Sequence, residues 1–196
     1  MNNNFFWGNP DASIHFCENK YDKNIWIAEY YNSISAFCYI IVAFYLYSKE
    51  KYIIGDDLLF LGISTFLFHM SLRSWAQILD ETSMIVLSYD VIQHVTKIKR
   101  IFIYPILVTY LIFHKYFIFF LMIFASMQIY LTKMGLKLTK GTKRMYLYLY
   151  IVFFILGFVC WIIDQIACEK ENNINYHFLW HNLSALAIFF GLLAVE

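Results

Sequence analysis

The chain has 196 residues, of which 61% are hydrophobic and 21% aromatic, and its formal net charge is +1. Because soluble domains are only ~45–50% apolar, this excess cannot all be buried in one small core, and lipid must be the solvent for much of the surface. The composition therefore argues against a soluble enzyme or a nucleic-acid binder, and it predicts an all-α integral membrane protein.

The N-terminal residues 1–26 are polar and aromatic, and they lack the basic and apolar regions of a signal peptide. Several of the apolar segments that follow are shorter than the ~20 residues a span needs, which a thin bilayer or interfacial anchoring tolerates. One interrupted helix is the alternative to two spans divided at His114-Lys115. We interpret seven segments as transmembrane helices of a single catalytic domain, residues 27–196: Ile27–Tyr47, Leu58–Leu72, Thr82–Ile98, Ile101–Phe113, Tyr116–Leu131, Met145–Cys168 and Tyr176–Val195.

Lysine and arginine residues set the orientation of such a bundle. Seven crossings place ten of the 15 basic residues on one side, among them Lys49, Lys97 and Lys133, and leave five on the other. This bias predicts that the N-terminus lies outside or in a lumen and that the C-terminus is cytosolic.

Three histidines lie at membrane depth near the outer side of the predicted bundle. His69 is near the outer end of the second segment, and His177 and His181 occupy the first two turns of the last one. An imidazole in hydrocarbon needs a partner, and an i, i+4 pair lies on one helix face. Three imidazoles and a water form a common catalytic zinc site, although iron and copper accept the same donors. The alternatives are an interhelical hydrogen bond for His69 and an interfacial pair for the other two.

Asp80 and Thr65 are candidate catalytic residues beside this cluster. Asp80 lies just before the third segment, where its carboxylate would either cap a helix or deprotonate a metal-bound water. Thr65 precedes His69 by one turn and shares its face, so its hydroxyl would either bond back to its own helix or donate to a developing oxyanion. Ser64 points ~100° away and is a weaker candidate.

Asp164 and four cysteines are the other notable groups. Asp164 lies within the sixth segment, where we expect either a bond that orients a ligand histidine or a structural bond between helices. Cys38 and Cys160 fall inside apolar segments and are expected to be buried as small hydrophobic residues. Cys17 and Cys168 both fall on the outer side, where they either form a disulfide in an oxidising lumen or remain two free thiols.

Short motifs follow one another along nearly the whole chain: Trp7-Gly8, Phe16-Cys17-Glu18, Ile27-Ala28-Glu29-Tyr30-Tyr31-Asn32-Ser33, Phe68-His69-Met70-Ser71-Leu72, Gln77-Ile78-Leu79-Asp80-Glu81, Ile163-Asp164, Cys168-Glu169 and His177-Phe178-Leu179-Trp180-His181. This ordered set resembles the alkaline ceramidase family, within a superfamily of seven-span hydrolases (CREST) that includes the adiponectin receptors. The resemblance implies that the three histidines bind zinc, that Asp80 acts on the zinc-bound water, and that Cys17 and Cys168 form a disulfide. It also implies a place in the endoplasmic reticulum or Golgi membrane. Thr65 stands where the family has a serine, so a hydroxyl survives with fewer rotamers.

A second departure from the family concerns a calcium site near the N-terminus. Glu18, Glu29 and the Phe16 carbonyl match that site. His15 stands where an aspartate is expected and Lys20 where an asparagine is expected, and an ammonium offers no oxygen to a hard cation. We therefore expect Ca²⁺ binding to be weakened or absent, with Lys20 supplying the positive charge beside the two glutamates.

The sequence thus predicts an intramembrane zinc amidase that cleaves the N-acyl bond of ceramides to a sphingoid base and a fatty acid. Its expected partners are a sphingolipid substrate and the lipid bilayer. Two rival functions use the same polar groups. A lipid-sensing receptor of the same superfamily would keep zinc for structure, and an ion transporter would use the groups as an ion path. The acyl-chain preference and the oligomeric state stay open.

Overall fold

The computed structural model describes residues 5–168 and 175–195, and within these ranges all the regular secondary structure is helical. Because α1 continues into α2 and η1 into α5, the described part of the chain forms seven helical columns. The prediction of an all-α fold is confirmed. The elements are α1 (Tyr30–Ser35), α2 (Phe37–Ser48), α3 (Tyr52–Ser71), α4 (Ser74–Thr96), the 3₁₀ turn η1 (Arg100–Phe102), α5 (Ile103–Phe113), α6 (Phe117–Leu138), α7 (Thr142–Ile166) and α8 (His177–Val195).

The helices have the length and composition of membrane-spanning segments. Large apolar side chains such as Ile41 and Ile166 are exposed on them, and lipid accommodates such a surface better than water does. α4 is also long but carries Asp80 and Asp90, and Arg100–Phe113 is apolar but shorter. These features indicate a multi-pass membrane protein, and the number of crossings stays a prediction. The five described segments long and apolar enough to cross a membrane are Tyr30–Ser48, Tyr52–Ser71, Phe117–Leu138, Thr142–Ile166 and His177–Val195.

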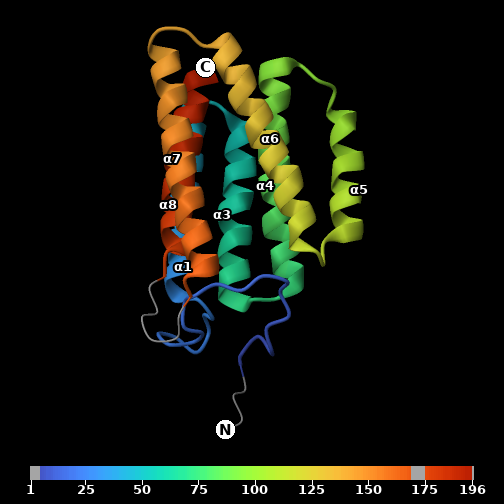
Figure 1. The fold of residues 1–196 in the computed structure, drawn as a ribbon, viewed down its shortest axis with the longest axis vertical. Helices are drawn as coiled ribbons and strands as arrows, with labels where there is room; N and C mark the ends of the chain where they lie inside the picture. Colours follow the sequence, from blue (N-terminus) through green and yellow to red (C-terminus); the bar gives the residue numbers. More distant parts are fainter. Residues whose placement is uncertain (1–4, 169–174, 196) are drawn as a thin grey trace.

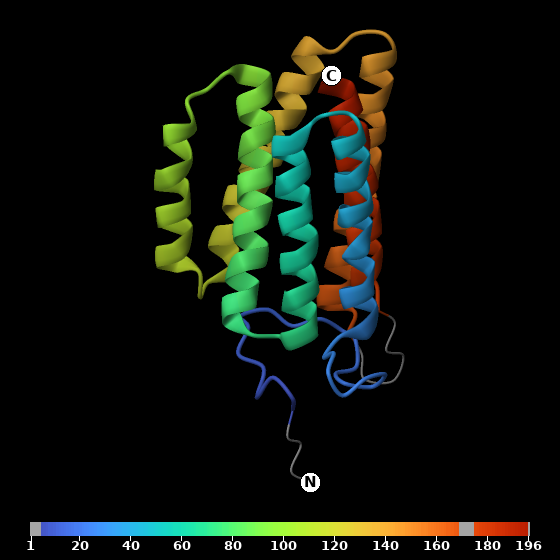
Figure 2. The same cartoon turned by 180° about the vertical axis from the view of Figure 1, so that it is seen from behind.

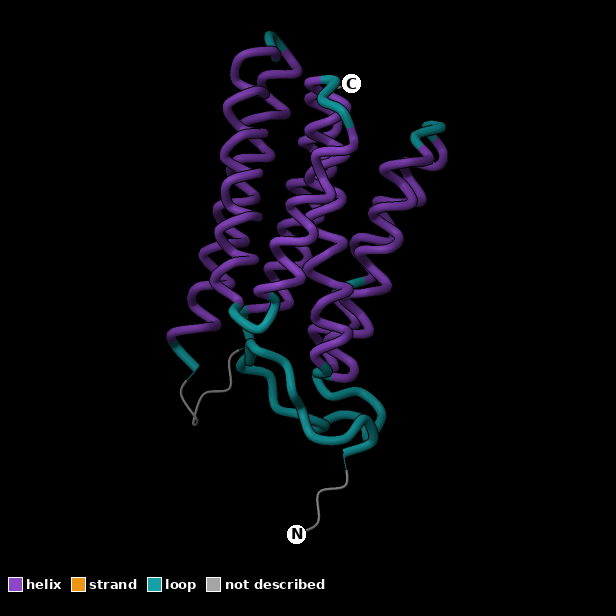
Figure 3. The backbone as a smooth tube through the Cα atoms, turned by 90° about the vertical axis from the view of Figure 1, so that its right-hand side faces the viewer, coloured by secondary structure: helices purple, strands orange, loops and turns teal. Residues whose placement is uncertain are grey.

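The helices run along the long axis of one bundle (Figure 1). α3 packs against both α2 and α4 (Figure 2), and α8 packs along α7. α5 lies at the edge of the bundle, where it contacts α4 and α6. The N-terminal segment covers one end of the bundle and the C-terminus lies at the other end (Figure 3). This arrangement brings the N-terminal segment to the end of α3 and the start of α8.

Two glycines let the helices approach one another closely. A Cβ on Gly62 of α3 would lie 2.5 Å from the Ile40 side chain and 3.3 Å from the Ala36 carbonyl oxygen. A Cβ on Gly157 of α7 would lie 3.1 Å from the Trp180 side chain of α8. Small residues at such crossings allow the backbone contact that drives helix association in lipid.

Backbone hydrogen bonds and a disulfide hold the N-terminal segment against the bundle. The amides of Ala28 and Glu29 donate to carbonyl oxygens in the last turn of α3, at 2.9 and 3.0 Å. Cys17 is bonded to Cys168, which follows α7, and their Cα atoms are 5.2 Å apart. The predicted disulfide is therefore confirmed, and the alternative of two free thiols is excluded.

The predicted segments differ from the helices mainly at their ends. α3 begins at Tyr52 rather than Leu58, and α6 continues to Leu138, because helical hydrogen bonding extends into polar residues that an apolar pattern does not include. The division of the fourth and fifth segments is confirmed, since α5 ends at Phe113 and α6 begins at Phe117.

The prediction that Cys38 and Cys160 are buried is wrong, because both are only half-buried. Both lie in segments long and apolar enough to cross a membrane, where lipid accommodates a partly exposed apolar residue. Cys38 Sγ nevertheless has a partner, since it donates to the His181 carbonyl oxygen at 3.2 Å.

Candidate metal centre

His69, His177 and His181 meet at the end of the bundle that the N-terminal segment covers. His69 lies in the last turn of α3, His177 begins α8, and His181 follows one turn later. The ring centroid of His69 is 4.9 Å from each of the other two, which are 4.6 Å apart. One ligand nitrogen from each ring lies within 4.8 Å of the others, and all three side chains are buried. The cluster can therefore hold a metal ion.

Hydrogen bonds orient two of the three rings. His69 Nδ1 is 2.6 Å from Glu29 Oε2, and His181 Nδ1 is 2.7 Å from the Ser35 hydroxyl oxygen. Each bond leaves Nε2 as the nitrogen available to an ion, as is usual for metal-binding histidines. The third ring is different, because His177 Nδ1 is buried and has no hydrogen-bond partner within the described residues. An unpaired buried nitrogen is costly, and a cation among three imidazoles would provide its partner, so the residues fit zinc.

Asp164 supports the cluster through the backbone of α8. Its Oδ1 accepts hydrogen bonds from the amides of Tyr176 and His177 at 3.0 and 3.2 Å, and its Oδ2 accepts one from the Cys17 amide at 3.1 Å. The first amides of a helix have no hydrogen-bond partner within that helix, so the Asp164 carboxylate from α7 caps α8. Its negative charge also interacts favourably with the positive end of the α8 dipole. Of the two roles predicted for Asp164, the structure contains the bond between helices.

Asp80 and Thr65 are hydrogen-bonded to each other. The Thr65 hydroxyl donates to Asp80 Oδ1 at 2.5 Å, so it points across to α4 rather than back to its own helix. The prediction that Asp80 starts a helix is wrong, because α4 begins at Ser74 and Asp80 lies in its second turn, where it cannot cap. The adjacent charges of Asp80 and Glu81 interrupt the apolar pattern, so the predicted segment starts after them although the helix begins earlier. The Ser64 hydroxyl lies 3.0 Å from the Ser83 hydroxyl instead.

The three histidines, Asp80 and Thr65 line one cavity, whose other walls are mainly aromatic and aliphatic. A second, more apolar cavity adjoins it within the bundle. Counted with their open mouths, the two enclose about 600 and 840 Å³ of space between atoms. The walls that both cavities share are formed by Tyr39, Leu61, Met84, Phe124 and Trp180.

Lys20 lies among the groups that match the family's calcium site. Its Nζ donates to the Phe16 carbonyl oxygen at 2.8 Å and also to the Glu29 carboxylate. Burial alone raises the pKa of Glu29, but the Lys20 ammonium and the His69 imidazole outweigh it and lower that pKa to about 2. Glu18 instead accepts hydrogen bonds from two backbone amides of α1, at 2.6 and 2.9 Å.

These contacts do not fit calcium. Ca²⁺ needs several oxygen ligands, and the Lys20 ammonium already occupies the Phe16 carbonyl and one Glu29 oxygen. His15, which stands where the family has an aspartate, is exposed. Weakened or absent calcium binding therefore stays our prediction, and a tethered ammonium is the physical reason for it.

The sequence does not predict two contacts of the histidine cluster. Glu29 is expected only in the calcium-type site, whereas its second carboxylate oxygen orients His69. Ser35 is not singled out, although it orients His181. The only signal for Ser35 is a hydroxyl inside an apolar segment, and such hydroxyls usually bond to their own helix.

Removing the Asp164 carboxylate should destabilise this end of the bundle. Asp164→Ala leaves the Cys17 and Tyr176 amides without this acceptor, and it leaves the His177 amide with only the Asn175 side-chain oxygen. We therefore expect a loss of about 1–3 kcal/mol in the free energy of unfolding, with weaker metal retention. Asp164→Asn keeps one acceptor oxygen and should lose less. Chemical unfolding in detergent measures the difference, with the exposed neighbour Ile166→Ala as control. Equal stability of Asp164→Ala and the control would contradict the capping role.

Lys20→Met should destabilise the protein by about 3 kcal/mol, because it leaves the buried Glu29 carboxylate without its cation. This is the lower end of the ~3–5 kcal/mol range for broken buried pairs, since the Lys20 side chain is 26% exposed. Thermal unfolding with and without added Ca²⁺ measures both points. We expect no calcium response in the wild type and a stabilising response in Lys20→Asn, which supplies an oxygen ligand.

The matched control is Lys23→Met, which removes an exposed ammonium that forms a salt bridge with the neighbouring Asp22. If calcium raised the unfolding temperature of the wild type, or if the Lys20 and Lys23 variants were equally stable, the tethered-cation account would be wrong.

Comparison with known proteins places these features in one family. Residues 8–196 match the family model described as Ceramidase. The chain is 24% identical over 229 residues to alkaline ceramidase 3 of Mus musculus, a match that covers 96% of this chain and 84% of the mouse protein. It is 26% identical over 206 residues to the alkaline ceramidase of Arabidopsis thaliana, covering 90% and 79%. A shorter match, 34% identical over 87 residues, to alkaline ceramidase YPC1 of Saccharomyces cerevisiae covers 40% of this chain and 28% of the yeast protein. The chain therefore belongs to the ceramidase family, as its motifs predict.

Proposed function

We propose that the protein is an intramembrane zinc-dependent amidase that hydrolyses the N-acyl bond of ceramides to a sphingoid base and a free fatty acid. Its family supports the substrate class, because the relatives named above are alkaline ceramidases. The observation that carries the proposal is the buried histidine cluster, which shares one cavity with Asp80 and Thr65. Neutral imidazoles without a thiolate favour zinc among the transition metals.

The chain's own residues position the reaction. Zinc, when bound, polarises the amide carbonyl and lowers the pKa of water from ~15.7 to ~7. His69, His177 and His181 would hold the ion, and Glu29 and Ser35 keep two of these rings in the orientation that exposes Nε2. The largely apolar walls of the cavity limit the water around the scissile bond, which strengthens each electrostatic interaction there.

Asp80 is the general base and then the general acid in this proposal. Its carboxylate accepts a proton from the attacking water and later delivers that proton to the leaving amine. Thr65 holds one carboxylate oxygen of Asp80 in the resting site, which aims the other at the cavity. As the carbonyl oxygen becomes negative, the same hydroxyl can rotate to donate to it.

The adjoining apolar cavity suits the hydrocarbon chains of a ceramide. It is bounded mostly by aliphatic and aromatic side chains and adjoins the reaction site, with which it shares five wall residues. We propose that substrate enters sideways from the bilayer, so that its amide reaches the metal centre while its chains stay in apolar surroundings.

The end that holds the histidines is proposed to face a lumen, with seven crossings and a cytosolic C-terminus. The N-terminal segment and the C-terminus lie at opposite ends of the bundle (Figure 1), which an odd number of crossings requires. The loops near Lys49, Lys97 and Lys140 lie at the C-terminal end, as the positive-inside rule expects for a cytosolic face. The Cys17–Cys168 disulfide fits an oxidising lumen, such as that of the endoplasmic reticulum or Golgi.

His181→Ala should remove both the metal and the activity. We expect about one zinc per chain and ceramide cleavage in the purified wild type, because three ligands and a water complete a catalytic zinc site. Elemental analysis and release of labelled fatty acid measure the two. His114→Ala, whose ring lies outside the cluster, should keep both. Unchanged turnover by metal-free His181→Ala protein would refute the mechanism, and zinc without any turnover in the wild type would favour a receptor.

Thr65→Ala should lower kcat by a factor of about 10²–10³, because it removes an oxyanion donor and frees the Asp80 carboxylate. Thr65→Ser should keep most of the rate, since the hydroxyl is retained. Ser64→Ala is the matched control, because its hydroxyl contacts Ser83 rather than the cavity. Steady-state kinetics on one ceramide decide the point, and a Thr65→Ala enzyme as fast as the Ser64→Ala control would exclude Thr65 from catalysis.

A further inference from the structure

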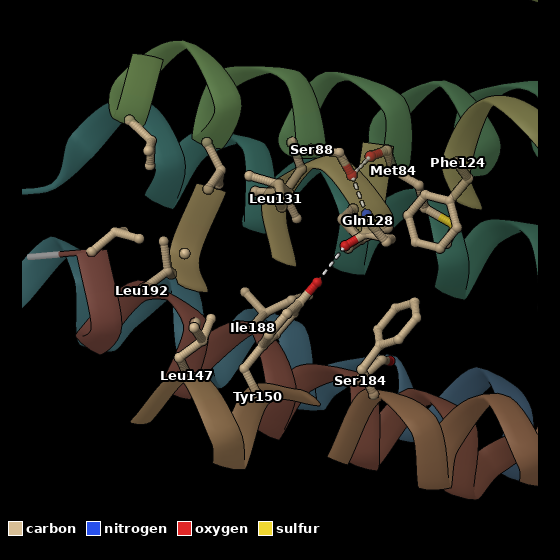
Figure 4. A pocket seen from close by; sticks show the side chains of 18 of the residues that line it. Met84, Ser88, Phe124, Gln128, Leu131, Leu147, Tyr150, Ser184, Ile188 and Leu192 are labelled. Carbon is tan, nitrogen blue, oxygen red and sulfur yellow. Dashed lines mark hydrogen bonds between the residues drawn. The ribbon is translucent and has the colours of Figure 1, made fainter. Parts of the chain in front are cut away.

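Three polar side chains form a hydrogen-bonded bridge across the apolar cavity beyond the metal centre (Figure 4). The Tyr150 hydroxyl of α7 donates to Gln128 Oε1 of α6 at 3.0 Å, and Gln128 Nε2 donates to the Ser88 hydroxyl oxygen of α4 at 2.8 Å. Ser88 in turn donates to the Met84 carbonyl oxygen at 2.7 Å. Figure 4 shows Tyr150 and Gln128 reaching toward each other from opposite walls. We call the hydrogen-bonded pair of Tyr150 and Gln128, which Ser88 supports, the Tyr150–Gln128 bridge.

The bridge stands between two halves of the cavity. Phe124 and Ser184 lie on one side of it in Figure 4, and Leu131, Leu147 and Leu192 lie on the other. Phe124 also lines the cavity of the metal centre, so its side is the one that adjoins the reaction site. An alkyl chain that extends from the reaction site therefore meets the bridge before it reaches the leucines.

The hydrogen bonds of the bridge make it resist separation. Tyr150 and Gln128 are only 8% and 9% exposed, and the walls around them are mostly hydrocarbon. Moving them apart to admit a chain leaves a hydroxyl and an amide unpaired in apolar surroundings, which is unfavourable. An aliphatic side chain at either position would move aside without that penalty.

The position of the bridge corresponds to a definite chain length. The Tyr150 ring packs on Gly191, where a Cβ would lie only 3.2 Å from it. Gly191 follows His181 by ten residues in α8, which is ~15 Å along the helix axis. An extended alkyl chain of this length has roughly a dozen methylene groups, because each ~1.5 Å carbon–carbon bond advances the chain by somewhat less than its length.

We propose that the Tyr150–Gln128 bridge is a specificity determinant that limits the length of the alkyl chain the enzyme accepts, an inference that rests on the proposed function. Medium-length chains end on the reaction-site side of the bridge with all its hydrogen bonds intact. Very long chains enter the far half only when the bridge opens, and so they react more slowly.

The test uses Tyr150→Phe and Gln128→Leu, which remove the bridge from opposite ends, so a folding defect in one variant leaves the other informative. The readout is the ratio of kcat/KM for a very-long-chain ceramide to that for a medium-chain one. One series varies the acyl chain and a second varies the sphingoid chain. We expect the ratio to rise about tenfold in both variants within one of the two series, and that series identifies the chain that occupies the cavity.

Two further variants sharpen the comparison. Tyr148→Phe makes the same substitution at an exposed position of α7 and should leave the ratio unchanged. Leu131→Phe adds bulk in the far half, so combining it with Tyr150→Phe should reverse the gain for very long chains while medium chains react as before.

Binding of free fatty acids of both lengths to the same purified proteins repeats the comparison without turnover. Length-dependent binding that disappears in Tyr150→Phe, in a wild type that hydrolyses no ceramide, would sink the proposed enzyme function but not the bridge. Ratios and binding that are the same in the wild type, both bridge variants and Tyr148→Phe would overturn the inference.

Discussion

A polar group inside this bundle must find its partner within the protein, because hydrocarbon offers none. That constraint organises the metal centre. Glu29, the residue before α1, is hydrogen-bonded to His69 of α3, and Ser35 of α1 is hydrogen-bonded to His181 of α8. Asp164 of α7 binds the first amides of α8. The bonds that satisfy these groups also fix where the imidazoles point, so the architecture of the site and the packing of the bundle depend on the same contacts.

The N-terminal segment is part of the centre rather than an appendage. It is tied to the end of α3 by backbone hydrogen bonds and to the residue after α7 by the Cys17–Cys168 disulfide. Lys20 places a positive charge beside Glu29, which lets the buried carboxylate stay ionised and orient His69. The Lys20 ammonium contacts the Phe16 carbonyl oxygen and the Glu29 carboxylate, two of the groups expected to bind calcium. The charge of Lys20 in this segment therefore affects the orientation of His69 through Glu29.

Away from this polar end, the interior of the bundle is mainly apolar. The cavity beyond the metal centre is lined largely by hydrocarbon, and the Tyr150–Gln128 bridge interrupts it. A site that reacts at one end and holds alkyl chains in the remainder suits an amphipathic lipid with one amide. In our proposal, the depth of the apolar part, rather than the metal centre, governs which lipids fit.

The histidine cluster was predictable because its residues are rare at membrane depth and an i, i+4 pair leaves little freedom in geometry. The all-α fold and the disulfide also follow from sequence patterns and family motifs. Asp80 was misplaced relative to its helix, because the adjacent charges of Asp80 and Glu81 interrupt the apolar pattern inside α4. Ser35, Gln128 and Tyr150 could not be paired from sequence, since each bond joins helices whose relative rotation only the packed structure fixes.

The central claim, that imidazoles from α3 and α8 close around one ion, is tested most directly by X-ray absorption at the zinc edge of the purified protein. The account predicts three nitrogen ligands and one oxygen ligand at ~2.0–2.1 Å. A shell containing sulfur at ~2.3 Å, or a spectrum of hydrated zinc without imidazole scattering, would contradict it.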